Sequence, residues 1–518
     1  MRRRDLLIAL SLANLCYLRV WSELLTYTRA DTYLMKLPPP PVEYLAVMLN
    51  VLLAGMVFWI AASVAARSKP TLLHGRGVAL SEVAFLLLLL VPLNALRAVL
   101  ANRLDFLRSA IFSIVAPRIV ELIAAVVAIL SVVLILKFHR QFAHIAAAGL
   151  VALSPFCVIT FGQAIWKMTH YDTSAFAAKP LAPRLPVVPN SPRMLWVVAD
   201  EWDYRLTFVD RPSSLALPEI DRLRKDSLFA ERADPPGWET PVSMPGYFTG
   251  KLVDAVRYDG PAELQVHFRG ASQSEPWSQQ PSVFISARAL GFNVALVDWF
   301  HPTCRVLSGL THCEWWPMAR QFSSVGSSFG DVLRNQTRSL FETTLLSAFG
   351  QSLAGHQQAR DYHEILQEGC ATANNPEYGL VVLHLPVPHA PHAYDRRTGT
   401  FTLRNSPIRG YIDSLALLDR TIGELRRSME SSGEWDRTTV LFTSDHHYRE
   451  AEALDGKDDL RIPYLLKLAS QKEGIVYTER FNAVLTHDLV LAIMKSEVVT
   501  TADVARWLDA NRVRVPES

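Results

Sequence analysis

Three short stretches of the sequence concentrate side chains that bind metal ions. They are Asp200-Glu201-Trp202-Asp203, the histidine-rich run of residues 384–392, and Ser444-Asp445-His446-His447. Carboxylate oxygens and imidazole nitrogens are the ligands of zinc-type sites. A single acidic cluster is more often a solvated surface, and a lone histidine is more often structural. The three clusters together predict a metal site, provided that the fold brings them to one place.

A hydroxyl group that could act beside such a metal lies in residues 237–251, GWETPVSMPGYFTGK. Thr240 precedes Pro241, and proline suits the first position of a helix. A threonine at a helix N-terminus lies among free N–H groups and at the positive end of the helix dipole. Next to a divalent metal, its hydroxyl could lose its proton near neutral pH and attack phosphorus. The alternative is that Thr240 only caps the helix.

The elements that would position these side chains are four short apolar runs without polar alternation, at residues 194–199, 293–297, 380–385 and 439–443. Such runs are typical of strands buried on both faces of a parallel sheet. Helical patterns separate them, notably over residues 412–429. In open α/β sheets, ligands bind beyond the carboxyl ends of the strands. Because three of the runs end at the three clusters, we expect an α/β catalytic domain in residues 194–518 with its site at that edge.

Thr240 follows Asp200 by forty residues. It opens the series Thr240-Pro241-Val242-Ser243-Met244-Pro245. Two further motifs come later in the chain, Thr249-Gly250-Lys251 and Ser444-Asp445-His446. Over residues 193–468 these motifs resemble the alkaline phosphatase superfamily, in its sulfatase and phosphoethanolamine transferase branches. The first series is similar to the Thr-x-x-Ser-x-Pro of the transferases, and the second to the Thr-Gly-Arg that closes the sulfatase signature. The resemblance implies a mostly parallel sheet sandwiched by helices.

The resemblance also implies a role for each site residue. The metal ligands would be Asp200, Thr240, Asp445 and His446, with Glu201 joining them or binding a second ion. Zinc is the expected metal, with magnesium, manganese and calcium as alternatives. Thr240 would carry a covalent phospho-intermediate, and His389 would protonate the leaving group. Lys457, which opens a stretch similar to the basic segment of sulfatases, would steady the charged oxygens.

Some residues depart from the family pattern. Sulfatases convert a cysteine or serine to formylglycine within Cys/Ser-x-Pro-x-Arg, whereas this chain has Thr240 and Met244 at those places. Ordinary formylglycine sulfatase activity is therefore not expected. His447 stands where the transferases have a small residue, and residues 298–305 have no counterpart in the transferase pattern. His384 and His392 also lack a counterpart and are interpreted as structural.

Five apolar runs precede the α/β region, at residues 6–25, 44–66, 78–100, 119–136 and 142–166. Runs of about 20 apolar residues can span a bilayer. We therefore expect residues 1–166 to form a bundle of five transmembrane helices, which again resembles lipid A phosphoethanolamine transferases. The distribution of basic residues places the N-terminus in the cytoplasm and everything after Trp166 outside. The expected location is the cytoplasmic (inner) membrane, with an extracytoplasmic catalytic domain.

The connector between the two regions, residues 167–193, has a proline at every third position from Pro180 to Pro192. This is the period of a polyproline II helix, so we expect a semi-rigid spacer. Cys304 and Cys313 are close enough in sequence to form a disulfide in an oxidising compartment. The formal net charge is only +2 and no nucleic-acid motif is present, so nucleic acid is not an expected partner.

The sequence thus predicts a membrane-bound, metal-dependent transferase. It would move a phospho-substituent such as phosphoethanolamine from a membrane lipid donor to an envelope glycan or lipid acceptor, through phospho-threonine at Thr240. If water were the acceptor, the enzyme would be a phosphodiesterase or phosphatase. A non-catalytic envelope scaffold is the third interpretation, and it predicts that the four metal-binding side chains are dispersed. The sequence does not indicate an oligomeric state.

Overall fold

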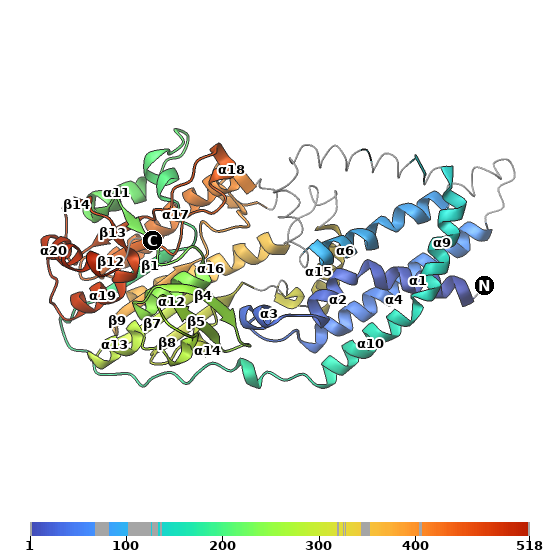
Figure 1. Ribbon diagram of the computed structural model, residues 1–518, viewed down its shortest axis with the longest axis horizontal. Helices are drawn as coiled ribbons and strands as arrows, with labels where there is room; N and C mark the ends of the chain where they lie inside the picture. Colours follow the sequence, from blue (N-terminus) through green and yellow to red (C-terminus); the bar gives the residue numbers. More distant parts are fainter. Residues whose placement is uncertain are drawn as a thin grey trace. The chain divides into compact units, whose positions relative to one another are not determined.

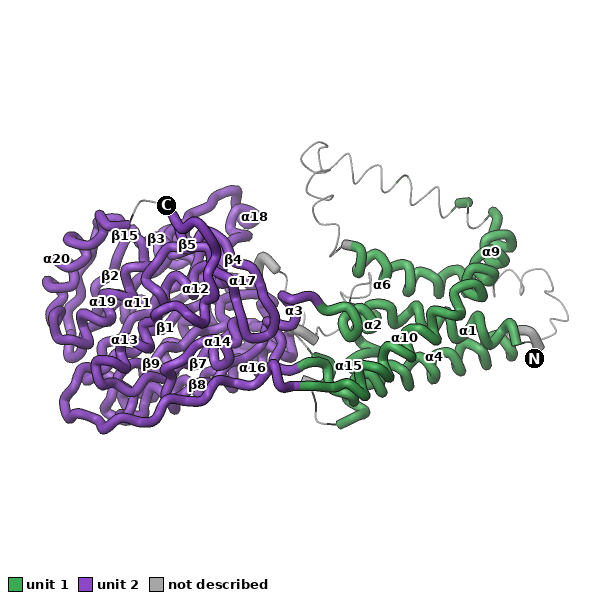
Figure 2. The backbone as a smooth tube through the Cα atoms, turned by 60° about the horizontal axis from the view of Figure 1, so that its bottom comes forward, with its two compact units in different colours: residues 1–27, 38–172, 321–353 green, residues 28–37, 173–320, 354–518 purple. Residues whose placement is uncertain are grey.

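The computed structural model describes residues 3–67, 82–101, 126, 133–134, 137–318, 321–324, 326, 328–342, 353–402 and 407–515. The chain divides into two compact units (Figure 2). Unit 1 comprises residues 1–27, 38–172 and 321–353, and unit 2 comprises residues 28–37, 173–320 and 354–518. The boundary between the units is therefore crossed more than once along the chain. The segment 28–37 belongs to unit 2, and the segment 321–353 belongs to unit 1.

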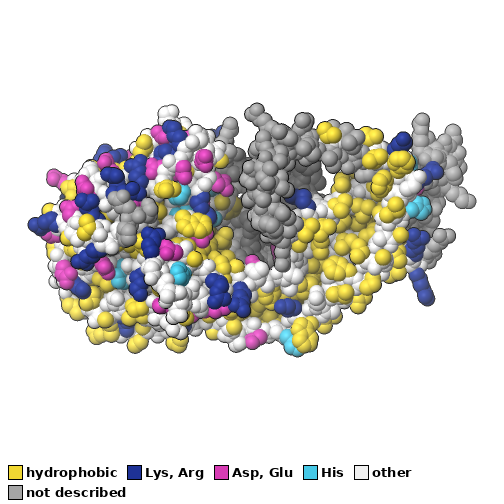
Figure 3. Space-filling model, in the orientation of Figure 1, with side chains coloured by type: hydrophobic (Ala, Val, Ile, Leu, Met, Phe, Trp, Pro, Cys, Tyr) yellow, Lys and Arg dark blue, Asp and Glu magenta, His cyan; other side chains and the backbone are white. Residues whose placement is uncertain are grey.

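Unit 1 is helical (Figure 1). Its helices are α1 (Arg3–Cys16), α2 (Leu18–Leu25), α4 (Pro41–Arg67), α6 (Leu90–Ala101), α9 (His139–Ala152), α10 (Ser154–Thr169) and α15 (Phe329–Glu342). Figure 3 shows hydrophobic side chains gathered on its surface, and large apolar residues of α4 and α10 such as Val57 and Val158 are exposed. Exposed apolar surface of this kind marks contacts with a membrane or with other proteins.

Among the described residues, two helical stretches are long and apolar enough to cross a membrane, Pro41–Val64 and His139–Thr169. The pair α1 and α2, bent by 59° at its break, would be a third. The prediction of five transmembrane helices is therefore not confirmed. Of the two remaining runs, 78–100 is described only from residue 82 and contains the short helix α6, and most of 119–136 lies outside the described residues.

Unit 2 is built on a mostly parallel sheet, as predicted. In the described part of the chain this is an eight-stranded sheet of order β14-β2-β13-β12-β1-β9-β7-β8. The strands β8, β7, β9, β1 and β12 are mutually parallel, and β13 is antiparallel to β12. Their bounds are β1 Met194–Ala199, β2 Leu228–Ala230, β7 Asn293–Phe300, β8 His312–Pro317, β9 Tyr378–Leu385, β12 Thr439–Ser444, β13 Tyr464–Lys467 and β14 Ile475–Tyr477. The four strands expected from the sequence are thus confirmed.

Helices cover both faces of this sheet because its central strands are apolar on both sides. In β1, Trp196 and Val198 pack with α12 (Thr240–Thr249), α13 (Val283–Ala289) and α19 (Thr486–Met494). The alternate residues Leu195 and Val197 pack on the other face, with α11 (Pro218–Asp226), α16 (Leu353–Asn374) and α17 (Pro407–Ser431). The last of these contains the helix predicted over 412–429. The fold is therefore the helix–sheet–helix sandwich expected of the catalytic domain.

The proline-rich connector lies along unit 2. The backbone N–H groups of Lys179 and Ala182 donate to the carbonyls of Cys304 and Leu310, and that of Leu185 donates to Asn293 Oδ1, each at 2.8 Å. These three donors are spaced by three residues, which is the period of a polyproline II helix. The prolines therefore lie along one edge of the segment and the donating N–H groups along another. The segment therefore does not stand free as a spacer over these residues.

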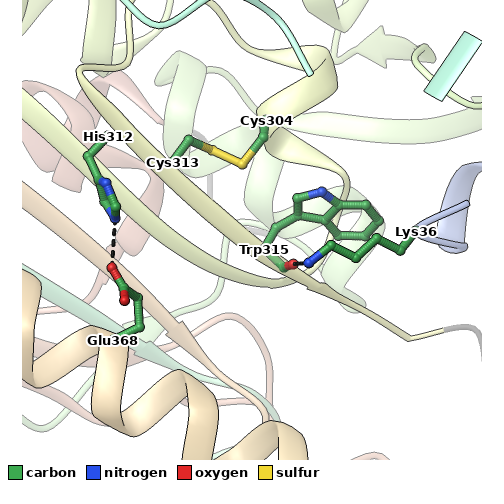
Figure 4. The surroundings of a disulfide bond; sticks show 6 residues. All are labelled: Lys36, Cys304, His312, Cys313, Trp315 and Glu368. Atoms are coloured by element: carbon green, nitrogen blue, oxygen red, sulfur yellow. Dashed lines mark hydrogen bonds and ion pairs between the residues drawn. A yellow bond between two sulfur atoms is a disulfide. The ribbon is translucent and has the colours of Figure 1, made fainter. Parts of the chain in front are cut away.

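The predicted disulfide between Cys304 and Cys313 is present, with their Cα atoms 5.6 Å apart (Figure 4). Cys304 lies in the short helix α14 (Thr303–Val306) and Cys313 in β8. The bridge therefore fixes the chain that leaves β7 to the neighbouring strand. The remaining cysteines, Cys16, Cys157 and Cys370, are free.

Candidate active site

Thr240 is the first residue of α12, and Glu239 occupies the N-cap position without a capping side-chain hydrogen bond. The hydroxyl of Thr240 instead donates to Asp445 Oδ2 at 2.8 Å. It lies 3.3 Å from Asp200 Oδ2 and 3.4 Å from His446 Nε2. The structure thus brings Thr240, Asp200, Asp445 and His446 together, and it does not support the alternative that Thr240 is a capping residue.

The sheet register explains this convergence. Ala199, the last residue of β1, is paired with Ser444 at the end of β12 and with Leu385 at the end of β9. Asp200 and Asp445 therefore leave adjacent parallel strands at the same level. Asp445 Oδ1 accepts hydrogen bonds from the backbone N–H groups of Glu201 at 3.2 Å and His446 at 2.9 Å. These bonds orient the carboxylate so that its second oxygen faces Thr240.

The tautomer of His446 follows from its surroundings. Its Nδ1 lies 2.8 Å from the carbonyl oxygen of His447, which can only accept a hydrogen bond. Nδ1 must therefore carry the proton, and Nε2 presents its lone pair to the cluster, 3.4 Å from Asp445 Oδ2. A metal-binding histidine is held in the same way, with the outer ring nitrogen donating to a carbonyl or carboxylate.

His384, interpreted from the sequence as structural, also belongs to the cluster. Its Nδ1 lies 2.8 Å from Asp298 Oδ1, and its Nε2 lies 3.8 Å from Asp200 Oδ2. In the part of the chain described here, Asp200, His384 and Asp445 form the group whose ligand atoms lie within 4.8 Å of one another. Among the same residues, Asp200 Oδ1 and His384 Nε2 are buried without a hydrogen-bond partner. These two orphaned atoms and the donor chemistry fit a divalent cation.

The electrostatics of the cluster also favour a bound cation. Burial, together with the charges of Asp445 and Glu201, raises the pKa of Asp200 well above its usual range. Burial opposes ionisation of Asp445 as well, but the neighbouring His446 and His384 lower its pKa. Two buried carboxylates this close repel each other, and a bound cation would remove that repulsion.

Glu201 does not join the cluster through its carboxylate. Its Oε1 accepts from Arg449, with both Nε and Nη2 at 3.0 Å. The residue has a φ of +62°, a conformation that non-glycine residues rarely adopt outside functional or strained sites. That conformation turns its backbone N–H toward Asp445, so Glu201 contributes to the site through its main chain and through Arg449.

The two predicted catalytic side chains outside the metal cluster differ in their surroundings. His389 is half-buried, its ring lies 5.0 Å from that of Trp299, and burial lowers its pKa. Lys457 is largely exposed, and its Nζ lies 3.1 Å from Asp210 Oδ2. The structure therefore does not place Lys457 with the buried cluster. The positive charge of Arg449 does act on Asp200 and opposes the rise in its pKa.

The comparison with known families decides the class of the protein. A family model described as Sulfatase matches residues 193–495, more than half of the 518-residue chain. The chain belongs to the sulfatase family. This confirms the predicted membership of the alkaline phosphatase superfamily and the prediction of a sulfatase-like enzyme. The presence of threonine at position 240 remains a departure from the formylglycine-forming members.

Solved structures similar to this sulfatase-family chain share little sequence with it. For a phosphonate monoester hydrolase of Agrobacterium radiobacter, the identity is 15%, the TM-score is 0.39, and 59% of this chain and 74% of that chain are covered. For the phosphonate monoester hydrolase of Silicibacter pomeroyi, the values are 14%, 0.41, 59% and 73%. For the PsFucS1 sulfatase of Pseudoalteromonas, they are 14%, 0.39, 61% and 74%. A search of curated proteins found no match.

Proposed function

We propose that the protein is a membrane-bound, metal-dependent transferase that moves a phospho-substituent, such as phosphoethanolamine, through a covalent intermediate on Thr240. The observation that carries this proposal is the position of the Thr240 hydroxyl, 2.8 Å from Asp445 and within 3.4 Å of Asp200 and His446. Threonine cannot become formylglycine, so this member of the family must use the hydroxyl as it stands. A hydroxyl nucleophile that forms an ester with phosphorus suits group transfer.

The residues that would hold the metal are Asp200, Thr240, Asp445, His446 and His384. Two carboxylates and two imidazoles are typical zinc ligands, and zinc is the proposed metal. When bound, the metal would supply positive charge that lowers the pKa of the Thr240 hydroxyl. Asp298 would orient His384 through the 2.8 Å contact with Nδ1, which is the usual arrangement around a metal-binding histidine.

In the first half of the reaction, Thr240 Oγ1 forms a bond to phosphorus while the bond from phosphorus to the donor alcohol breaks. The hydroxyl proton passes to Asp445 Oδ2, the oxygen that already accepts it. The protonated form of His389 gives its Nε2 proton to the departing alcohol. Because burial lowers the pKa of His389, this form is the minor one near neutral pH. In the second half, the acceptor hydroxyl attacks phosphorus, its proton returns to His389, and Thr240 takes its own proton back from Asp445. Atoms and protons balance over the cycle.

The phosphate oxygens need a positive group, and we assign this role to Arg449 rather than to Lys457. Arg449 pairs with Glu201 next to the cluster, whereas Lys457 pairs with the exposed Asp210. A guanidinium presents several donors in a plane and can bind two phosphate oxygens at once. Arg449 is half-exposed, which leaves part of its donor set for a substrate.

The proposed donor is a membrane phospholipid and the proposed acceptor an envelope glycan or lipid. Among the described residues of unit 1, two helical stretches, or three with the bent pair, have the length and composition of membrane spans. The disulfide between Cys304 and Cys313 is typical of an oxidising compartment outside the cytoplasm. These two observations support the cytoplasmic membrane as the location, with the α/β domain on its outer side.

Hydrolysis is the second candidate, because the family consists of enzymes acting on esters and water could replace the acceptor. The interpretation as a non-catalytic scaffold predicted dispersed side chains, whereas Asp200, Thr240, Asp445 and His446 lie together. Transfer and hydrolysis share the first half-reaction and differ only in what removes the group from Thr240.

The experiment that tests the proposal is intact-mass measurement of the purified full-length protein in lipid nanodiscs containing phosphatidylethanolamine, with zinc added. The expected result is a phosphoethanolamine adduct on Thr240 that is lost in Thr240→Ala. Thr249→Ala is the matched control, because Thr249 is another buried threonine of α12 whose hydroxyl bonds only its own helix, to Pro245 O. An adduct that disappears on adding a glycan or lipid acceptor supports transfer, and one that disappears in buffer alone supports hydrolysis. A wild-type protein that forms no adduct contradicts the proposed intermediate.

A further inference from the structure

The segment 28–37 follows α2 and precedes α4, two helices of unit 1, yet it is part of unit 2. It forms the short helix α3 (Arg29–Leu34), whose first turn is closed by a capping box of Thr28 and Asp31. Arg29 pairs with Asp259 at 2.7 Å. A connection between two apolar helices is thus built into the catalytic unit.

Arg305 anchors the main chain of this segment. Its guanidinium donates to the carbonyls of Tyr33 at 2.9 Å, Met35 at 3.0 Å and Lys36 at 3.2 Å. Arg305 is buried and lies over the ring of Trp315 at 4.8 Å. Figure 4 shows the Lys36 side chain directed at the main-chain oxygen of Trp315, to which its Nζ donates at 3.4 Å. The segment is therefore fixed at several points rather than loosely docked.

The side chain of Tyr33 leads from this segment to the nucleophile. It is fully buried, and its hydroxyl lies 2.9 Å from His301 Nδ1. His301 Nε2 lies 3.3 Å from the main-chain oxygen of Thr240. A carbonyl can only accept, so Nε2 carries the hydrogen and Nδ1 presents a lone pair to the Tyr33 hydroxyl. The Tyr33 hydroxyl thus donates to His301, and His301 donates to the main-chain oxygen of Thr240.

We propose that Tyr33 is a positioning residue for Thr240 and acts through His301. The proposal rests on the proposed function of Thr240 as the nucleophile. His301 belongs to the stretch 298–305, which has no counterpart in the transferase pattern. Its neighbour Asp298 orients His384, so the carboxyl end of β7 supports both the metal cluster and the nucleophile. The connection between two apolar helices is in this way part of the catalytic machinery.

The first test is Tyr33→Phe in the full-length protein, which removes one oxygen and keeps the ring. A misplacement of about 1 Å can reduce a rate about 100-fold. We expect kcat for transfer or hydrolysis to fall about tenfold, with KM within about twofold, because the substrate contacts are untouched. The matched control is Tyr362→Phe, since Tyr362 is a buried tyrosine whose hydroxyl lies 2.9 Å from Thr421, outside the site. It should keep wild-type kcat.

A double-mutant cycle tests whether Tyr33 acts through His301. His301→Phe removes both ring nitrogens, so adding Tyr33→Phe should cause no further loss of kcat. His301→Gln keeps both an N–H donor for the Thr240 carbonyl and an amide oxygen that can accept from Tyr33. It should retain more activity than His301→Phe, and adding Tyr33→Phe to it should lower kcat further. Additive losses of Tyr33→Phe and His301→Phe would overturn the proposal.

Amide hydrogen exchange of the first turn of α12 gives a readout that does not depend on turnover or on the metal. The proposal is supported if Tyr33→Phe exchanges faster in the first turn of α12 and unchanged in α17. In Tyr362→Phe, exchange in the first turn of α12 should equal that of the wild type. A Tyr33→Phe protein with kcat within about twofold of wild type and unchanged exchange in α12 overturns it. If the wild-type protein neither transfers nor hydrolyses the group, the proposed function fails, and the exchange measurement still decides the role of Tyr33.

Discussion

Thr240 Oγ1 lies 2.8 Å from Asp445 Oδ2, although 205 residues separate them in the chain. The contact forms because β12 ends directly before Asp445 and α12 begins at Thr240. Asp445 is held by two backbone N–H groups, and Thr240 is held through its helix and through His301. The pair is therefore fixed before any substrate binds, as catalysis by a positioned hydroxyl requires.

Replacing Thr240 separates the chemical role from a structural one. Thr240→Ala should abolish the covalent adduct and lower turnover by several orders of magnitude. The stability cost should stay near 1 kcal/mol, as for a lost buried hydrogen bond. Thr240→Ser keeps a hydroxyl and should retain part of the activity. Adduct mass, transfer rate and a melting curve for each variant decide the matter, with Thr249→Ala as control. A folded Thr240→Ala protein with near-normal transfer would refute the mechanism.

Asp298 should control metal affinity without touching the metal. Its Oδ1 accepts from His384 Nδ1 at 2.8 Å, and both residues are buried. Removal of such an outer partner typically lowers metal affinity by about 10–100-fold. We expect Asp298→Asn to show this loss in competition titrations with a zinc chelator, and His384→Ala to show a larger one. Equal zinc affinity in wild type and Asp298→Asn would mean that Asp298 does not support the metal site, and equal affinity in His384→Ala would mean that His384 does not bind the metal.

Most of the fold could be predicted from the sequence, because its signals are local. The strands β1, β7, β9 and β12 are continuous apolar runs, and the polar clusters at the ends of β1, β9 and β12 indicate a site. The sequence does not predict His384 as a metal ligand, because this histidine has no counterpart in the family pattern. Its role depends on Asp298, 86 residues away.

Other features could not be predicted because they depend on distant contacts. Tyr33 lies 268 residues from its partner His301. The family pattern predicts Lys457 at the anion, whereas in the structure its side chain is largely exposed and pairs with Asp210. The number of membrane spans was predicted from hydropathy alone. The described residues contain two such helices, or three with the bent pair.

The disulfide should stabilise unit 2. It closes a loop between residues nine apart, and a short loop of this kind contributes about 2–3 kcal/mol. Cys304→Ala should therefore lower the melting temperature of the purified protein by several degrees under oxidising conditions. Cys370→Ala is the matched control, because Cys370 is a free cysteine of the same unit. If the two variants have the same melting temperature, the bridge does not contribute to stability.

His392 should make the folded state sensitive to mild acid. Burial lowers its pKa from 6.5 to about 4. Between these values the unfolded chain binds a proton that the folded chain does not, so stability falls as the pH decreases from 6.5 toward 4. The contribution should approach about 3 kcal/mol at the acid end of that range. Melting curves of His392→Gln should lose this part of the pH dependence. The exposed His363 provides the control variant His363→Gln, which should behave like wild type.

Arg449 and Lys457 offer the last test, because the family pattern favours one and the structure the other. Arg449 lies 3.0 Å from Glu201 beside the cluster, and its charge opposes the rise in the pKa of Asp200. Loss of one group that stabilises transition-state charge costs about 100–1,000-fold. Arg449→Ala should therefore reduce kcat/KM by about that factor, while Lys457→Ala should leave it within about twofold. Glu201→Gln separates two explanations, since it weakens the ion pair but leaves the guanidinium in place. If Glu201→Gln lost as much activity as Arg449→Ala, Arg449 would act only by holding Glu201. If Lys457→Ala showed the large loss instead, the role inferred from the family pattern would stand and the assignment to Arg449 would be wrong.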